Sequence, residues 1–295
     1  MPQEPRIIQD YRYYLRMERQ LSPNTVSAYG RDASEFLAAA EVEPRALRSE
    51  DVESYLAARS GELSKRSQAR LLSSLRSFFD WLILEGERKD NPCDRVDAPK
   101  LGRYLPEVLS VEEVTAILES VDTARGGWTA LRDRAILEIL SGCGLRVSEA
   151  CGLCISQVYL REGFVRVVGK GNKERLVPLG EMAADAFSLY LQARPEAAEP
   201  AFDDVAFLNK NGHPLSRVAI FNLVRKQALL AGVRKEISPH TFRHSFATHL
   251  IENGADLRIV QEMLGHESIL TTEIYTHIDQ ATWQNAILSH HPRRR

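Results

Sequence analysis

The sequence predicts a mainly α-helical protein of two domains, with a small antiparallel sheet in the second domain. At 295 residues the chain is longer than one hydrophobic core normally supports. Apolar residues recur at helical spacing from Ile7 to Glu85, whereas residues 96–108 lack periodicity and hold helix breakers. We therefore expect an N-terminal helical bundle over residues 1–95, a linker over 96–108 and a mixed α/β domain over 109–295.

The positions of two helices in the first domain are predicted from signals at their N-termini. Ser22 followed by Pro23 is typical of a helix N-terminus, because serine caps the first turn and proline fits its first position. A second helix runs from Ser64 to Leu84. The apolar side chains expected to face inward are Val26, Tyr29, Phe36 and Leu37 in the first helix and Leu71, Leu75, Phe78 and Leu82 in the second. The opposite face of the second helix carries Lys65, Arg66, Arg70 and Arg76.

The second domain opens with helical signals. Ser110 and Glu113 have the spacing of a capping box. Residues 130–140 predict a buried helix, which ends near Gly142 and Gly144.

A β-hairpin is predicted next. Residues 164–168 and 175–178 are short apolar runs on either side of the turn Gly169-Lys170-Gly171-Asn172. Lys170 would therefore lie at the tip of the hairpin.

Ser238-Pro239 predicts the start of a helix that could bind an anion. His240 and Arg243 would lie on one face of its first turns, where free backbone N–H groups and a guanidinium both suit a phosphate. Taken alone, His240 is more often a histidine of no functional consequence. The stripe formed by Phe242, Phe246 and Leu250 anchors the helix inward.

A further helix is expected after Gly254, with Asp256 as its cap and Gly265 as its end. Leu257, Val260 and Leu264 are predicted to form its buried face. His266 follows the closing glycine, and Thr271 or Thr272 can cap a short helix that carries Tyr275. A single tyrosine in such a place is usually a packing residue.

Gly144-Leu145-Arg146-Val147-Ser148-Glu149 places an arginine directly after glycines, with Glu149 one turn later and able to orient it. By itself this pattern is a common surface ion pair.

Charge is unevenly distributed along the chain, although the formal net charge of −2 gives no sign of a polyanionic partner. Residues 209–244 carry seven Lys/Arg against Glu236 alone, and residues 251–279 carry six carboxylates against Arg258 alone. This pattern predicts a bipolar surface, because phosphates respond to local charge. Ordinary solvated helix faces are the alternative explanation.

The four cysteines are too few and too scattered for a disulfide scaffold, and nothing resembles a signal peptide or a long apolar span. We therefore expect a cytoplasmic protein. Cys151-Gly-Leu-Cys154 resembles half of a zinc or redox motif, but no second pair stands at ligand spacing, so packing is the better interpretation.

Together these motifs carry a family resemblance. Gly-Leu-Arg146-Val-Ser-Glu, the hairpin Gly-Lys170-Gly-Asn-Lys-Glu-Arg, His240-x-x-Arg243-His, Leu-Gly-His266 and Tyr275 resemble, in order and spacing, the catalytic motifs of the tyrosine recombinases (phage integrases). The N-terminal helices are similar to the SAM-like core-binding domain of that family. Arg-Leu-Val-Pro-Leu-Gly180, Tyr-Thr-His-Ile278 and the end His290-His291-Pro292-Arg293 most resemble its Xer group.

The resemblance implies a reaction and a role for each motif residue. Tyr275 would attack a phosphodiester and form a 3′-phosphotyrosyl link, and rejoining would need no ATP, metal or other cofactor. Arg146 and Arg243 would hold the non-bridging oxygens, and His266 would donate a hydrogen bond to the same phosphate. His240 would act as acid and base, and Lys170 would protonate the departing 5′ oxygen.

The resemblance also implies double-stranded DNA with a specific recombination site as partner. A second recombinase of the XerC kind, assembly into a tetramer and activation by a DNA translocase of the division machinery follow from it too. Trp283, Ile287 and Leu288 would dock on a neighbouring subunit, or else fold on their own domain. The expected DNA contacts, which would clamp the duplex from both domains, are Lys65, Arg66, Arg70, Arg76, Arg217, Arg225 and Lys226.

Three alternatives remain open at this point. A type IB topoisomerase shares the chemistry but relaxes supercoils as a monomer without site preference. A mobile-element integrase differs in the DNA site it binds. A DNA-binding protein without catalysis would give no covalent adduct.

Overall fold

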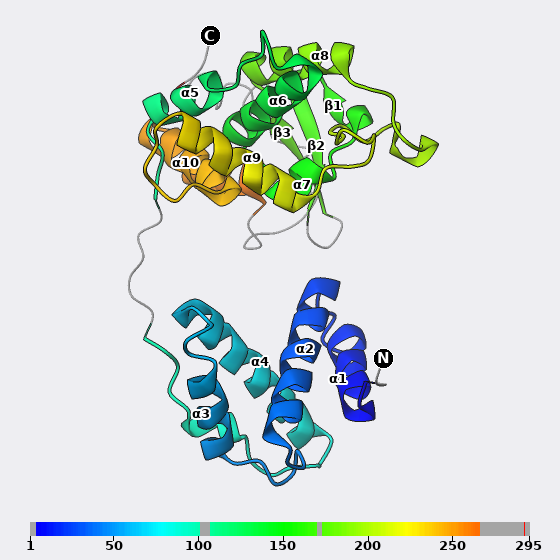
Figure 1. The fold of residues 1–295 in the computed structure, drawn as a ribbon, viewed down its shortest axis with the longest axis vertical. Helices are drawn as coiled ribbons and strands as arrows, with labels where there is room; N and C mark the ends of the chain where they lie inside the picture. Colours follow the sequence, from blue (N-terminus) through cyan, green and yellow to red (C-terminus); the bar gives the residue numbers. More distant parts are fainter. Residues whose placement is uncertain (1–3, 101–106, 170–172, 266–291, 293–295) are drawn as a thin grey trace. The chain divides into compact units, whose positions relative to one another are not determined.

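The computed structural model describes residues 4–100, 107–169, 173–265 and 292. The chain divides into two compact units, Met1–Tyr104 and Leu105–Arg295, each of which is described by itself (Figure 1). No helix within the described ranges has the length and hydropathy needed to cross a membrane.

All regular secondary structure in the described part of the first unit is helical (Figure 1). Ser22 and Ser64 accept hydrogen bonds from the backbone N–H groups of Thr25 and Ser67, so both predicted helix starts are confirmed. The helices are α1 (Arg6–Met17), α2 (Pro23–Ala40), α3 (Ser49–Ala58), α4 (Lys65–Leu84) and the short 3-10 helix η1 (Pro92–Arg95).

An aromatic cluster forms the centre of this unit. The ring of Tyr11 lies 5.1 Å from that of Phe78 and 5.3 Å from that of Trp81, and its hydroxyl donates to Ser77 Oγ at 3.0 Å. Aromatic side chains combine a large buried area with favourable edge contacts. The apolar face predicted for α4 is buried as expected, with Leu71, Leu75, Phe78 and Leu82 at most 3% exposed.

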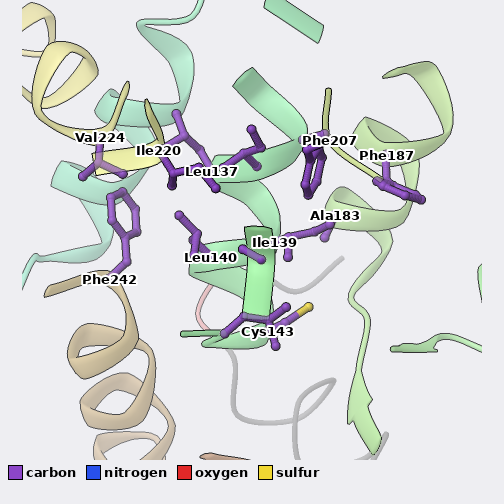
Figure 2. Close-up of a cluster of buried hydrophobic side chains, with 14 of the residues drawn as sticks. Leu137, Ile139, Leu140, Cys143, Ala183, Phe187, Phe207, Ile220, Val224 and Phe242 are labelled. Atoms are coloured by element: carbon purple, nitrogen blue, oxygen red, sulfur yellow. The ribbon is translucent and has the colours of Figure 1, made fainter. Parts of the chain in front are cut away.

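The second unit packs around helix α6 (Gly127–Cys143). This helix contacts α5 (Val111–Glu119), α7 (Val147–Cys151), α8 (Glu181–Ala193), α9 (Arg217–Leu230) and α10 (Pro239–Glu252). Figure 2 shows Leu137, Ile139 and Leu140 of α6 among Phe187, Phe207, Val224 and Phe242. Residues 135–143 of α6 are nearly all buried, as expected for a helix that other helices cover on several sides.

The sheet of the second unit has the order β1-β2-β3 and is antiparallel. Strands β2 (Phe164–Val168) and β3 (Glu174–Pro178) form the predicted hairpin, whereas the two-residue β1 (Val158–Tyr159) was not predicted. Val167 pairs with Arg175, and residues directly opposite in a sheet share a face. Arg175 therefore points to the buried face with Val167, and it is only 5% exposed.

The start of the second unit is fastened to α10. The backbone N–H of Leu109 donates to Ser245 Oγ at 2.8 Å, and His249 Nε2 donates to the Leu109 carbonyl at 2.8 Å. Lys235 Nζ donates to the Val108 carbonyl at 2.9 Å. Both Ser245 and His249 lie on α10, so the chain enters this unit along that helix. The predicted capping box of Ser110 is present at the next residue.

The last described helix, α11 (Leu257–Leu264), packs on α10. Its predicted cap Asp256 and its terminating Gly265, at φ 62°, are confirmed. Val260 and Leu264 are buried together with Met263, but Leu257 is 55% exposed, so its predicted burial is wrong. Side chains tilt toward the N-terminus of a helix, and Leu257 at the first position therefore leans out past the packed turn. The 3-10 helices η2 (Ile155–Gln157) and η4 (Pro200–Phe202) complete the described elements.

Candidate active site

Arg146 caps the N-terminus of α7, two residues after the glycine that ends α6. Gly144 has φ 58°, and a Cβ there would meet Phe246 Cδ1 at 2.5 Å, so only glycine fits this turn. Glu149 accepts from the Arg146 backbone N–H at 2.8 Å and from Nη1 at 2.9 Å. The prediction that Glu149 orients Arg146 is confirmed.

Arg243 reaches the same carboxylate from α10. Its Nη1 lies 3.9 Å from Glu149 Oε2 and donates to the Gly144 carbonyl at 2.8 Å. Ser238 caps α10 with Pro239 in its first turn, as predicted, which places Arg243 one turn into the helix. The side chain of Arg243 is 10% exposed, whereas that of Arg146 is 34% exposed. Arg146 therefore offers more of its guanidinium to a ligand in solution.

Arg175 is a third arginine at this point, and the sequence did not reveal it as a site residue. From β3, Nη1 and Nη2 donate to Glu149 Oε1 and Oε2 at 2.9 and 2.8 Å, in a bidentate pair. Both side chains are 4% exposed. We refer to Arg146, Glu149, Arg175 and Arg243 as the arginine cluster.

The three arginines also share the C-terminal end of α11. Arg175 Nε donates to the Met263 carbonyl at 2.7 Å, Arg243 Nη2 donates to the Leu264 carbonyl, and Arg146 Nη2 donates to the Gly265 carbonyl at 3.0 Å. Carbonyls in the last turn of a helix lack partners within the helix and form the negative end of its dipole. The arginine cluster therefore fixes the end of α11, the residue before His266.

The protonation states of the arginine cluster follow from its surroundings. Burial, together with the charges of Arg146 and Arg175, lowers the pKa of Arg243 to about 10, while the charge of Glu149 opposes the shift. Burial alone would raise the pKa of Glu149, but the hydrogen bonds and charge of Arg175, with the contacts of Arg146, outweigh it and lower that pKa. Glu149 and Arg243 are thus both charged near neutral pH. Three guanidiniums and one carboxylate give a net formal charge of +2.

The structure brings together two of the six predicted catalytic residues, Arg146 and Arg243. His240 is exposed in the first turn of α10. Lys170, His266 and Tyr275 lie outside the described residues, as do His277 and the predicted docking residues Trp283, Ile287 and Leu288. His249, also on α10, donates to the Leu109 carbonyl.

The predicted DNA contacts of the first unit lie along α4. Lys65 and Arg66 are exposed in its first turn. Arg70 is exposed too, but it pairs with the buried Asp32 at 2.5 Å. Arg76 is half-buried and donates to the Cys93 carbonyl at 3.0 Å. Lys65 and Arg66 are therefore the most accessible of the four.

The predicted contacts of the second unit lie on α9. Arg217, Arg225 and Lys226 are all exposed. Arg217, Phe221 and Arg225 are four residues apart and share one face, on which Arg225 lies over the Phe221 ring at 5.9 Å. Val218, beside them, is 67% exposed. This face combines positive charge with exposed apolar surface.

The structure describes both cysteines of the Cys151-Gly-Leu-Cys154 motif. Cys151 packs against the core of the second unit, as the sequence suggests. Among the described side chains, no group of three or more His, Cys, Asp or Glu is placed to hold a metal ion.

Comparison with known proteins identifies the family. Residues 107–282 match the phage integrase family, and residues 8–86 match the phage integrase N-terminal SAM-like domain. The chain is 45% identical over 286 residues to tyrosine recombinase XerD of Chlorobaculum tepidum, covering 95% of this chain and 94% of that protein. It is 42% identical over 295 residues to XerD of Listeria monocytogenes, covering 97% and 99%.

A solved structure supports the same assignment. The XerH site-specific recombinase bound to its difH substrate, in a pre-cleavage complex, is 27% identical with a TM-score of 0.66, covering 95% of this chain and 82% of that one. The predicted fold class, helical and SAM-like in the first part and mixed α/β in the second, is confirmed. The chain belongs to the phage integrase family, the DNA strand-exchange enzymes called tyrosine recombinases.

Proposed function

We propose that this chain is a XerD-type tyrosine recombinase that cuts and rejoins DNA through Tyr275. Arg146 and Arg243 are its phosphate-binding arginines. The observation that carries the proposal is the convergence of these two guanidiniums on Glu149 from α7 and α10. Guanidiniums bind phosphate oxygens through paired charge-assisted hydrogen bonds, so two arginines held at one point suit a scissile phosphate.

The proposed reaction exchanges one ester bond for another. The Tyr275 oxygen attacks the phosphorus and forms a new P–O bond, while the phosphate stays attached to the 3′ oxygen of the DNA. The bond between the phosphorus and the 5′ oxygen breaks. Phenol has a pKa of about 10, so only about 0.1% is ionised at pH 7 and a base is needed. We assign that role to His240, the hydrogen bond to the phosphate to His266, and protonation of the 5′ oxygen to Lys170.

The charge of the arginine cluster supports this reaction. A phosphodiester carries one negative charge, and its pentavalent transition state carries about two. The net charge of +2 on the arginine cluster matches the transition state better than the ground state. Stabilisation that grows toward the transition state is what accelerates a reaction.

The DNA contacts are proposed from exposure. Lys65 and Arg66 on α4, and Arg217, Arg225 and Lys226 on α9, carry positive charge on exposed side chains. Phosphate contacts of this kind supply most of the affinity and position the duplex. We include Arg70 and Arg76 as weaker contacts, because each already serves a partner within the first unit.

The biological role is proposed from the curated relatives. Proteins named XerD are 40–45% identical to this chain over nearly its full length, which favours a Xer recombinase over a mobile-element integrase. We propose resolution of chromosome dimers in the cytoplasm, by a tetramer with an XerC-like partner that a DNA translocase activates. A Xer-type recombination site would then be the substrate.

A nicked suicide duplex tests the proposal. The protein is incubated with a duplex that carries a Xer-type site, with and without the partner recombinase, and adducts stable to SDS are counted. We expect a covalent adduct whose digestion yields a peptide containing Tyr275. An adduct on another residue, or none under either condition, rejects the assignment. Relaxation of plasmids without a site would indicate a topoisomerase, and cleavage only at a mobile-element end would indicate an integrase.

A further inference from the structure

Arg175 is the most buried of the three arginines, and it enters the proposed reaction only as one charge of the arginine cluster. Its guanidinium directs one N–H of each Nη at Glu149 and its Nε–H at the Met263 carbonyl, so three of its five N–H groups are engaged within the protein. At 4% exposure the side chain is not accessible to DNA. Any contribution to the reaction must therefore act through its neighbours.

The position of Arg175 is closely specified. A Cβ on Gly265 would lie 3.3 Å from Arg175 Cδ, and a Cβ on Gly169 would lie 3.4 Å from Arg175 Nη1. Both glycines thus leave room that the Arg175 side chain occupies. A buried ion pair usually costs about as much in desolvation as it returns in attraction, so stability alone is a weak reason for placing one here.

Charge supplies a better reason. Glu149 orients Arg146, and it lies 3.9 Å from Arg243. Without another cation, its negative charge would cancel one of the two positive charges that a phosphate needs. The bidentate partner Arg175 offsets that carboxylate and leaves the charges of Arg146 and Arg243 in excess.

We propose that Arg175 is a positioning residue that neutralises Glu149, so that Arg146 and Arg243 together present two uncompensated positive charges to the scissile phosphate. The inference rests on the proposed function, since it concerns the same phosphate. Glu149 orients Arg146 but also carries a negative charge. Arg175 keeps that charge from weakening the attraction between the site and the phosphate.

The test uses Arg175→Met, which keeps the side-chain length but removes the charge, in single-turnover cleavage of the suicide duplex. We expect a loss of about 100-fold or more, comparable to removal of one transition-state donor. On a duplex with a methylphosphonate at the scissile position, which carries one negative charge less, we expect a loss of about tenfold or less. A defect of structure alone would lower both rates by the same factor.

Two more variants keep the test decisive if Arg175→Met folds poorly. The double variant Glu149→Gln with Arg175→Met restores the net charge of +2, and we expect it to cleave phosphate DNA at least about tenfold faster than Arg175→Met. Arg175→Lys keeps the charge but loses the bidentate geometry, and we expect equal losses on the two substrates. A double variant no faster than Arg175→Met overturns the proposal, as does an equal loss by Arg175→Met on both substrates.

The matched control is Arg134→Met. Arg134 pairs with the 3% exposed side chain of Glu138 at 2.8 Å, in α6 of the same unit. We expect this variant to lose stability and yet to cleave both substrates like wild type per folded molecule. A shift in the substrate ratio for Arg134→Met would show that any broken buried pair produces the effect, and would also overturn the proposal.

Titration with inorganic phosphate separates this inference from the proposed function. The arginine Nε–H signals are followed by NMR in wild type and in Arg175→Met. We expect about tenfold weaker phosphate binding in the variant, since one charge is lost from the site. If wild type forms no adduct but shows this difference, the proposed function fails and the role of Arg175 stands. Equal phosphate affinity in the two proteins rejects the role of Arg175.

Discussion

Arg146 and Arg243 donate to neighbouring carbonyls at the end of α11, Arg146 to Gly265 and Arg243 to Leu264. Two guanidiniums that come from different helices are therefore held at the same end of α11. They differ in exposure, at 34% for the Arg146 side chain and 10% for that of Arg243. Because of this difference, we expect substitution of the two arginines to have different effects on stability.

Arg146→Ala is expected to lose cleavage far more than DNA affinity or stability. Its partly exposed ion pair contributes about 1 kcal/mol or less to folding. Arg243→Ala should lose cleavage too, but also about 2–4 kcal/mol of stability, because two carbonyls lose a donor and the buried Glu149 loses a neighbouring positive charge. Urea unfolding, suicide-substrate cleavage and DNA binding measure the three effects. Equal losses of affinity and cleavage in Arg146→Ala would make that residue a binding contact instead.

Tyr275→Phe is expected to bind the recombination site about as tightly as wild type and to form no covalent adduct. The substitution removes one oxygen and leaves the aromatic ring. Gel-shift titration and SDS-stable adduct formation are measured on the same duplex, with wild type as the reference. Persistent adduct in this variant would move the nucleophile to another residue.

Glu149 makes the stability of the second unit depend on pH in the acid range. Its pKa is below the ordinary value of 4.5 in the folded protein. Its contribution is therefore fully present above the ordinary value and is lost as the pH falls through the lowered folded pKa. We expect the difference in unfolding free energy between wild type and Glu149→Gln to narrow from pH 7 to acid. The exposed Glu119→Gln serves as control, and a difference that stays constant with pH contradicts the prediction.

Gly265→Ala is expected to damage the arginine cluster as well as the helix end. Its φ of 62° is strained for alanine by about 1 kcal/mol, and the new Cβ would also press on Arg175. Gly127→Ala is the matched control, with φ 61° and nothing within 4 Å of its Cβ. We expect both variants to lose similar stability from the backbone, and cleavage to fall only in Gly265→Ala. Equal cleavage in the two would show that contact with Arg175 is unimportant.

Substitution on α9 should weaken DNA binding without abolishing chemistry. Arg217→Ala and Arg225→Ala should each lower the slope of log affinity against log salt by about one, the amount expected for one lost phosphate contact. Cleavage at saturating protein should remain. Arg161→Ala, an exposed arginine with no proposed role, is the control. An unchanged slope in both α9 variants would remove this face from the DNA contacts.

Local signals in the sequence predicted the elements well. Ser22, Ser64, Ser110 and Ser238 cap helices as expected, because a cap depends on residues three positions apart. The hairpin was predicted because alternation and turn residues lie within a short segment. Leu257 was misplaced, since periodicity gives the face of a helix but not where the packing on that face ends.

The arginine cluster was only half predictable. Arg146 and Glu149 are three residues apart, so helix geometry predicted their contact. Arg175 reaches Glu149 and Met263 across 26 and 88 residues, and only the register of β2 and β3 turns it inward. No local pattern distinguishes such an arginine from one that faces solvent on the same strand.

The fastening of Val108 and Leu109 has a mechanical consequence. A pull on the chain that joins the two units would load the hydrogen bonds to Lys235, Ser245 and His249 before it reached the hydrophobic interior. Two of those bonds are made by side chains of α10, the helix that carries His240 and Arg243. A force applied at Leu109 would thus reach the helix that carries these two proposed catalytic residues.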